Sequence, residues 1–141
     1  MKSFKSTAVA AVTPERLWSI IADVVRWPEW TPTMTSVEPL GPPALTVGAM
    51  FKVRQPNLRP AVWRVTAVEP NQSFTWVSKS PGVSVVAHHR VQPIGADQSA
   101  IELEIVFLGV FAPLIAMMVG KLTQSYLETE ATSLKQRVES T

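Results

Sequence analysis

Histidine is the side chain in this protein that titrates nearest neutral pH, and the sequence holds two of them side by side, His88 and His89. They lie in a stretch that alternates between apolar and polar residues, as a strand with one buried face does. The alternation predicts His89 on the buried face and His88 on the opposite face, so the pair cannot bind one metal ion. His89 could serve as a general acid or base. The alternative is a core histidine hydrogen-bonded to a main-chain or side-chain acceptor.

The residues that other kinds of catalytic centre require are missing from the sequence or are not predicted on the buried face. The chain has no cysteine, and the alternation places no carboxylate on the buried face, so we expect no metal site and no cofactor. For the same reason no inward pair of carboxylates is predicted for glycosidase-type acid/base chemistry. The six glycines form neither a phosphate-binding loop nor a nucleophile elbow.

Seven strands are expected to position these groups. A first strand is predicted over residues 2–12, and six more over residues 36–40, 50–55, 62–68, 73–79, 83–93 and 100–107. Short turns separate the last six, which favours an antiparallel meander with one apolar and one wet face. The inward residues that could contact a ligand are Phe51, Gln55, Trp63, Phe74, Trp76, Ser78, His89, Leu103 and Phe107.

Two short helices are expected between the first and second strands. Thr13 has the residue type of an N-cap, and Pro14 suits the first helical position. Residues 23–30 are predicted to continue as a second short helical piece that breaks before Pro28. The rigid aromatic segment over residues 27–32 could plug or rim a cavity.

One long helix is predicted over residues 109–139, with Pro113 in its first turn. A helical stripe that begins with small residues and continues with mostly larger ones would face the sheet: Ala116, Gly120, Thr123, Leu127, Ala131, Leu134 and Val138. Because small residues leave room between helix and sheet, we expect Ala116, Gly120 and Thr123 to line a ligand cavity near the start of the helix. Alternatively, the aromatic residues fill the core and leave no cavity.

A second apolar stripe lies on the other side of this helix and comprises Phe111, Leu114, Ile115, Met118, Leu122 and Tyr126. If the first stripe faces the sheet, this one faces outward, as a homodimer surface, a membrane contact or a face covered by residues 27–30 or a loop. The assignment could also be exchanged in the first half of the helix. In that case Met118 and Leu122 would line the cavity and Gly120 would mark a bend.

Composition narrows the class of protein. The 141 residues suit a single domain over residues 1–141, and with 46% apolar and 17% charged residues the chain should bury a sizeable core. The net charge is +2 and no run of Lys or Arg occurs, so we expect no nucleic-acid partner. The longest apolar run, residues 105–119, is too short to span a bilayer. No signal-peptide pattern begins the chain, and we expect a cytoplasmic protein.

Several motifs resemble the START-like (SRPBCC) superfamily, which includes polyketide cyclase/dehydrase-type and birch-pollen-allergen-like proteins. The matching stretches are residues 13–18, Asp23, residues 27–30, Gly48, residues 65–70, residues 74–76, and His89 four residues before Pro93. The resemblance implies an α+β helix-grip fold, in which a curved antiparallel sheet of about seven strands wraps a long C-terminal helix around a deep cavity. The superfamily includes lipid carriers, aromatase/cyclases, ring-hydroxylase subunits and chaperone regulators, so the fold leaves the activity open.

Three functions follow from these features. The leading hypothesis is a protein that binds a small apolar or aromatic molecule, such as a lipid, polyketide or quinone, with His89 and a few polar groups orienting it. The alternative is an enzyme, a polyketide cyclase, aromatase or dehydratase in which His89 assists proton transfer. The third is a module with a filled core that binds a protein or membrane through the outward face of the helix.

Overall fold

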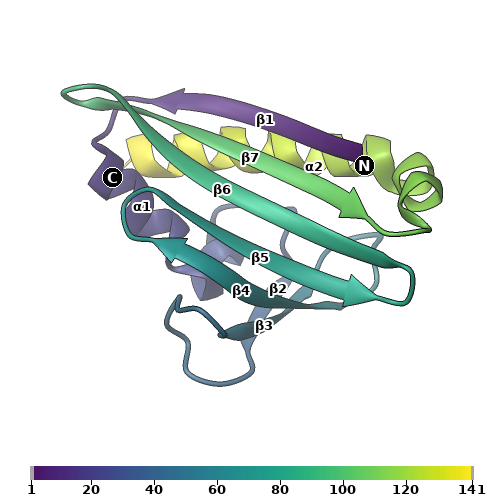
Figure 1. Ribbon diagram of the computed structural model, residues 1–141. Coiled ribbons are helices and arrows are strands. Elements are labelled where there is room, and N and C mark those ends of the chain that lie inside the picture. Colours follow the sequence, from purple (N-terminus) through teal and green to yellow (C-terminus); the bar gives the residue numbers. More distant parts are fainter. Residues whose placement is uncertain (1, 141) are drawn as a thin grey trace.

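The computed structural model describes residues 2–140, and within this range seven strands form one antiparallel sheet. The order across the sheet is β1-β7-β6-β5-β4-β3-β2, so β2 to β7 form the expected meander and β1 joins its edge beside β7. The curved sheet holds a long C-terminal helix against its concave face (Figure 1). The strands are β1 (Lys2–Ala10), β2 (Ser36–Pro39), β3 (Met50–Arg54), β4 (Ala61–Glu69), β5 (Ser73–Ser80), β6 (Val83–Gly95) and β7 (Gln98–Leu108). The predicted α+β, helix-grip-like fold is confirmed.

The β6–β7 hairpin is longer than the alternation predicts, because Gly95 still pairs with Gln98. Pro93 lies inside β6, where a proline cannot donate a ladder hydrogen bond. The strand register shifts between Pro93 and Gly95, and this irregularity accommodates the missing donor. The predicted end of that strand at Pro93 was therefore too early.

The first short helix is α1 (Pro14–Ile21), and Thr13 caps it as expected: its Oγ1 accepts a hydrogen bond from the main-chain N–H of Arg16 at 3.2 Å. A 3₁₀ helix follows, η1 (Val24–Glu29). The predicted break before Pro28 is wrong, since Pro28 lies within η1. Because proline has no N–H, only one main-chain hydrogen bond of this short 3₁₀ helix is lost. The N–H of Trp30 still donates to the carbonyl of Trp27 at 3.0 Å.

The long helix is α2 (Ala112–Glu139), and it starts three residues later than predicted. Gly109 has a φ of +113°, and Phe111 N–H donates to the carbonyl of Gly82 at 2.9 Å, so residues 109–111 form a turn held by the β5–β6 hairpin. The expected face packs on the sheet: Ala116, Gly120, Leu127, Ala131, Leu134 and Val138 are buried. The exchanged assignment is wrong, because Met118 is 69% exposed.

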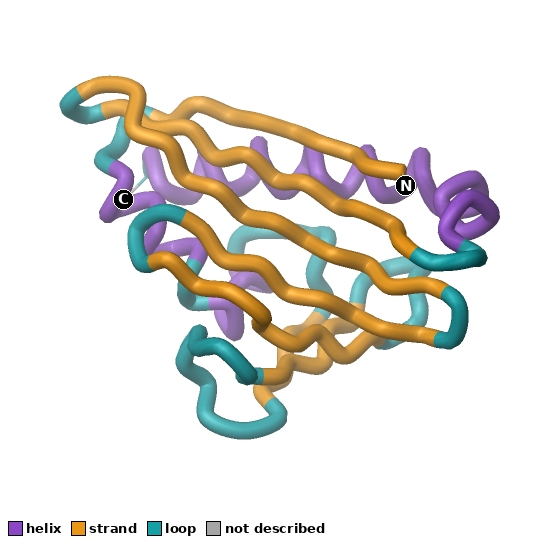
Figure 2. The backbone as a smooth tube through the Cα atoms, viewed as in Figure 1, coloured by secondary structure: helices purple, strands orange, loops and turns teal. Residues whose placement is uncertain are grey.

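The helix α2 lies off centre, along the β1–β7 side of the sheet, while α1, η1 and loops cover the rest of the concave face (Figure 2). The main core joins the sheet, α1, η1 and the C-terminal half of α2. A small second cluster of Phe107, Ala112 and Ala116 anchors the start of α2. Phe4, Val85 and Ile105 pack against both clusters and connect them. Among residues 2–140, no helix has the length and apolar character needed to cross a membrane.

Candidate functional site

A cavity of about 450 Å³ lies between the first half of α2 and strands β4 to β7. Its helix wall runs through Ile115, Val119, Thr123 and Tyr126, which follow one another at helical spacing, and ends with Leu127 and Glu130. The loop between β3 and β4 borders the cavity, and the hydroxyl of Tyr126 donates a hydrogen bond to the carbonyl of Pro56 in that loop. A volume of this size is typical of sites for small organic ligands.

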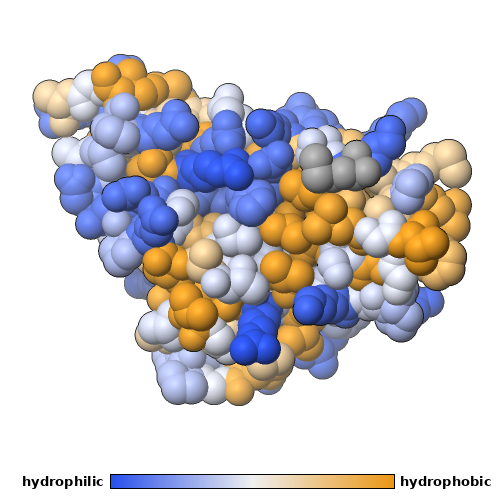
Figure 3. All heavy atoms as spheres, viewed as in Figure 1, coloured by the Kyte–Doolittle hydropathy of each residue, from blue (hydrophilic) through white to orange (hydrophobic). Residues whose placement is uncertain are grey.

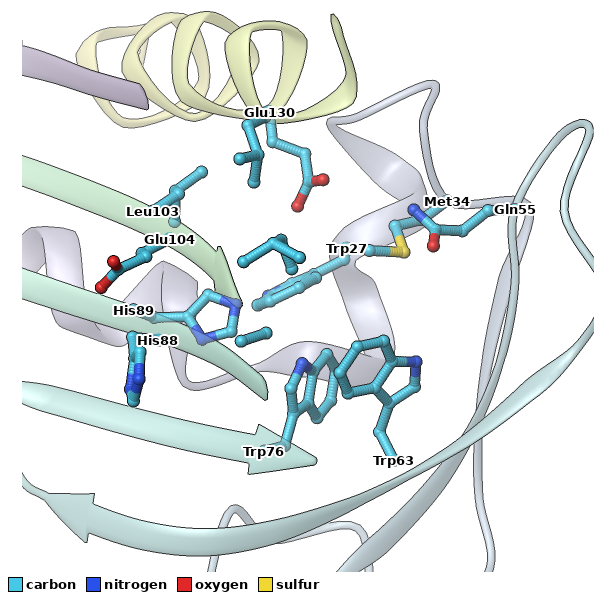
Figure 4. A pocket seen from close by; sticks show the side chains of 13 residues that line it. Trp27, Met34, Gln55, Trp63, Trp76, His88, His89, Leu103, Glu104 and Glu130 are labelled. Carbon is cyan, nitrogen blue, oxygen red and sulfur yellow. The ribbon is translucent and has the colours of Figure 1, made fainter. Parts of the chain in front are cut away.

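A second cavity of about 50 Å³ adjoins the first and is lined by Trp27, Trp76, His89 and Leu103 among others (Figure 4). Its volume suffices for a few water molecules or one small polar group of a ligand. Trp27 is buried here, and its indole N–H donates to the carbonyl of Ile21 at 3.0 Å, so the aromatic segment closes this end as a plug. Both cavities share the lining residues Gln55, Trp63, Ile105, Leu127 and Glu130.

The structure brings eight of the twelve residues predicted for ligand binding to these cavities. The main cavity is lined by Gln55, Trp63, Ser78, Phe107 and Thr123. The small cavity is lined by Gln55, Trp63, Trp76, His89 and Leu103. The four predicted residues that line neither cavity are Phe51, Phe74, Ala116 and Gly120.

The two small helix residues line neither cavity because they let α2 approach the sheet closely. A Cβ atom on Gly120 would lie 2.9 Å from Cζ of Phe4, so the glycine allows the helix to rest on β1. Ala116 packs beside Phe107. The gap therefore opens on the neighbouring stripe, from Ile115 to Tyr126, and not under the smallest residues.

The two aromatic residues that line neither cavity are core residues. Phe51 and Phe74 are both fully buried. The ring of Phe51 contacts Trp76, and that of Phe74 stacks on His89, so they support the side chains that line the small cavity.

The second apolar stripe divides between the cavity and the surface. Ile115 and Tyr126 line the cavity, whereas Phe111, Leu114 and Met118 are between 49% and 69% exposed. Apolar side chains gather at the end of the molecule where α2 begins (Figure 3). The homodimer through this stripe stays a prediction, and Ile115 and Tyr126 would contribute little to it.

The geometry of His89 favours a neutral ring. Its Nδ1–H donates to the carbonyl of Phe74 at 3.3 Å, which leaves Nε2 as a hydrogen-bond acceptor. Burial lowers the pKa of His89 from its ordinary 6.5 to about 3. A group with so low a pKa is a weak general base and carries no proton to give at neutral pH.

Glu130 is a carboxyl group inside the protein that the strand alternation did not predict. It is 7% exposed and lines both cavities, so the expectation that no carboxylate points inward is wrong. Burial raises the pKa of Glu130 to about 7, against the opposing effect of a hydrogen bond with Thr33. The helical spacing did carry the signal: Glu130 is three residues after Leu127 and four before Leu134, on the buried face.

The described residues, 2–140, contain no group of three or more His, Asp or Glu side chains placed to hold a metal ion. The side chains of His88 and Glu104 are held on the outer face of the sheet. His88 Nδ1 lies 2.9 Å from the hydroxyl of Thr75, and Glu104 accepts a hydrogen bond from Arg90 at 3.0 Å.

Comparisons with known proteins agree with this architecture. The model of a protein family described as polyketide cyclase/dehydrase and lipid transport matches residues 1–139. A START superfamily protein from Mycobacterium smegmatis has a similar structure, with a TM-score of 0.74 at 17% identity over 98% of this chain and 97% of that one. Norcoclaurine synthase from Thalictrum flavum gives a TM-score of 0.77 at 16% identity over 97% of this chain and 86% of the enzyme.

A third similar structure is the di-domain ARO/CYC BexL from the BE-7585A biosynthetic pathway, with a TM-score of 0.73 at 16% identity. The alignment covers 99% of this chain but 47% of BexL, so this chain spans about half of that protein. At these identities the likeness concerns the fold alone. No curated protein sequence matches the chain significantly.

Proposed function

Because the chain belongs to the polyketide cyclase/dehydrase and lipid-transport family, we propose that it binds a small apolar or aromatic molecule, such as a lipid, polyketide or quinone. The observation that carries this proposal is the cavity of about 450 Å³ between α2 and the sheet. Burying roughly 250 Å² of a ligand's apolar surface there would contribute on the order of 6 kcal/mol before the entropic cost of binding. Since about 6 kcal/mol alone corresponds to a Kd of about 40 µM, we expect apolar burial by itself to give weak binding that the polar contacts must strengthen.

A few polar side chains on the walls would orient the ligand. Gln55, Ser78 and Thr123 lie along the main cavity, between apolar residues. Arg59 lies in the loop that borders it and could pair with an acidic group at that end of a ligand. This arrangement combines an apolar body with a few polar contacts, as ligand sites commonly do.

An enzymatic function is the second candidate, and Glu130 is the observation that favours it. A carboxyl group whose pKa is raised to about 7 can both give and take a proton near neutral pH. In a cyclase- or aromatase-type reaction, Glu130 would then be better suited to proton transfer than His89. Turnover that collapses in Glu130→Gln while ligand binding persists would favour this candidate. A module with a filled core is less favoured, because the cavity is present.

The binding function can be tested with N-phenyl-1-naphthylamine, an uncharged apolar dye whose fluorescence rises when it leaves water. Thr123→Trp would fill part of the cavity, because Thr123 lies on its helix wall. Ser125→Trp is the matched control on the exposed side of the same helix. We expect saturable binding by the unmodified protein and by Ser125→Trp, and at least tenfold weaker binding by Thr123→Trp. Absence of binding, or equal affinity in a folded Thr123→Trp variant, would overturn the proposal.

A further inference from the structure

We propose that the small cavity receives an uncharged, oxygen-bearing end of the ligand, a hydroxyl or carbonyl group, held by Glu130 and His89. The inference rests on the proposed binding function and names the chemistry of the ligand. The side chain of Glu130 projects from α2, and that of His89 projects from β6 into the same cavity (Figure 4). Together they make the inner end of an otherwise apolar site polar.

Of the described residues that line the small cavity, none is a lysine or arginine. His88 and Glu104 also border it, but their side chains bond to Thr75 and Arg90 on the outer face of the sheet. A carboxylate or phosphate on the ligand would thus be buried beside Glu130 without a cation to pair with, which is costly.

His89 and Glu130 can both form hydrogen bonds with a ligand group in the small cavity. The Nδ1–H of His89 is used by the carbonyl of Phe74, so Nε2 of the neutral ring remains an acceptor. Glu130, when protonated, is both a donor and an acceptor. A ligand hydroxyl can donate to Nε2 and accept from the Glu130 carboxyl, and a ligand carbonyl can accept from Glu130 alone. The hydrogen bonds of either ligand group are then satisfied, and the ligand brings no net charge into the cavity.

The small cavity also limits the size of the group that it can receive. About 50 Å³ suits one small group and not a second ring. Trp27, Trp63 and Trp76 surround the space, with Trp63 and Trp76 ring centroids 5.6 Å apart. The ring that carries the hydroxyl would therefore remain in the main cavity, where Trp63, Phe107 and Tyr126 supply aromatic walls, which favours phenol-like ligands over branched alcohols.

The test compares 2-naphthol with naphthalene, its matched analogue without the hydroxyl, by isothermal titration calorimetry near pH 6. For the unmodified protein we expect 2-naphthol to bind about tenfold more tightly, the effect of one or two buried hydrogen bonds. In Glu130→Leu this preference should fall to threefold or less while naphthalene binding persists. Glu130→Gln keeps a donor and an acceptor and should retain the preference. His89→Phe, which removes Nε2, should reduce it.

The outcomes separate the two proposals. Equal affinities in the unmodified protein, or a tenfold preference that survives Glu130→Leu, would overturn the polar subsite but leave the apolar site standing. A preference unchanged in His89→Phe would overturn the role of His89. In Arg59→Met, which removes the cation that could bind an acid at the other end of the site, binding of 2-naphthoate as tight as that of 2-naphthol would overturn the requirement for an uncharged group. If not even naphthalene binds, the proposed function itself fails and this inference fails with it.

Discussion

The imidazole of His89 lies flat on the phenyl ring of Phe74, with centroids 4.0 Å apart and ring planes 2° apart. The same phenylalanine accepts the Nδ1–H of His89 through its main-chain carbonyl. Trp27 and Trp76 approach the imidazole from other sides, with centroids at 5.4 and 5.8 Å. This enclosure removes most of the water that a charged ring would need, so the folded protein holds His89 neutral.

Glu130→Gln should stabilise the protein at high pH and change little at low pH. The folded-state pKa of Glu130, about 7, lies above its ordinary value of 4.5, so the folded state loses stability as pH rises from about 4.5 to 7. Above that range the loss amounts to roughly 3 kcal/mol. Urea unfolding should thus show Glu130→Gln more stable by up to about 3 kcal/mol at pH 8 and near the unmodified protein at pH 4.5. A difference that is the same at both values would contradict this.

His89 contributes the opposite pH dependence of stability, which His89→Phe should remove. A folded-state pKa of about 3, below the ordinary 6.5, means that His89 costs stability as pH falls from about 6.5 to 3. Between about pH 4.5 and 6.5 the effects of His89 and Glu130 therefore oppose each other, and the unmodified protein should have a nearly flat profile. Without His89, stability should fall as pH rises through this window, by up to about 1.4 kcal/mol per pH unit.

The control for this pair of predictions is the double variant His89→Phe with Glu130→Gln. It lacks both groups and should be as flat between about pH 4.5 and 6.5 as the unmodified protein. A sloping profile for the double variant would mean that other groups govern the dependence.

Gly109→Ala should destabilise the fold by about 1–3 kcal/mol. Gly109 has a φ of +113°, and an added Cβ would lie 2.5 Å from the carbonyl oxygen of Gly82, a main-chain atom that cannot turn aside. Gly41→Ala is the control, since nothing lies within 4 Å of its Cβ position and its φ is not in the left-handed region. Denaturant unfolding that shows equal stability for the two variants would refute the structural role of Gly109.

Arg90→Met should raise the pKa of His88 and cost about 1 kcal/mol of stability. Arg90 Nη1 contacts Glu102 at 2.6 Å and Glu104 at 3.0 Å, and the cation also lowers the pKa of nearby His88, in addition to the effect of burial. Without Arg90 the two carboxylates remain, and both favour a protonated His88. NMR titration measures the shift, which should shrink in about 1 M salt. An unchanged or lower pKa would contradict the arrangement.

The strands and their inward faces could be predicted because alternation reports burial directly. Val53, Val65, Ala87 and Ile101 are all buried as the pattern indicates. Glu130 was missed because the expectation of no inward carboxylate came from strand alternation, whereas this residue lies on a helix and its helical spacing puts it on the buried face. The periodicity of a sequence predicts which face of a strand or helix is buried. The chemical type of a buried side chain then determines what that side chain can do.

The placement of the cavity could not be read from the helix stripe alone. A small residue such as Gly120 is compatible with a helix that lies close to the sheet and equally with an empty space between them. Only the position of Phe4 on β1 decides between these two arrangements. The position of Phe4 relative to α2 depends on contacts between residues far apart in the sequence. Helical spacing within α2 carries no information about such contacts. The stripe formed by Ile115, Val119 and Thr123 was therefore assigned only in part.

The contact between Gly120 and Phe4 also bears on how the capacity of the site could change. Because α2 rests on β1 at this point, the width of the opening on the far side of the helix depends on a residue that no ligand in the cavity touches. Gly120→Leu would clash with Phe4 and force α2 or Phe4 to shift, which would change that width. Selectivity for ligand size can thus be adjusted from the closed side of the helix, while every residue that contacts the ligand stays the same.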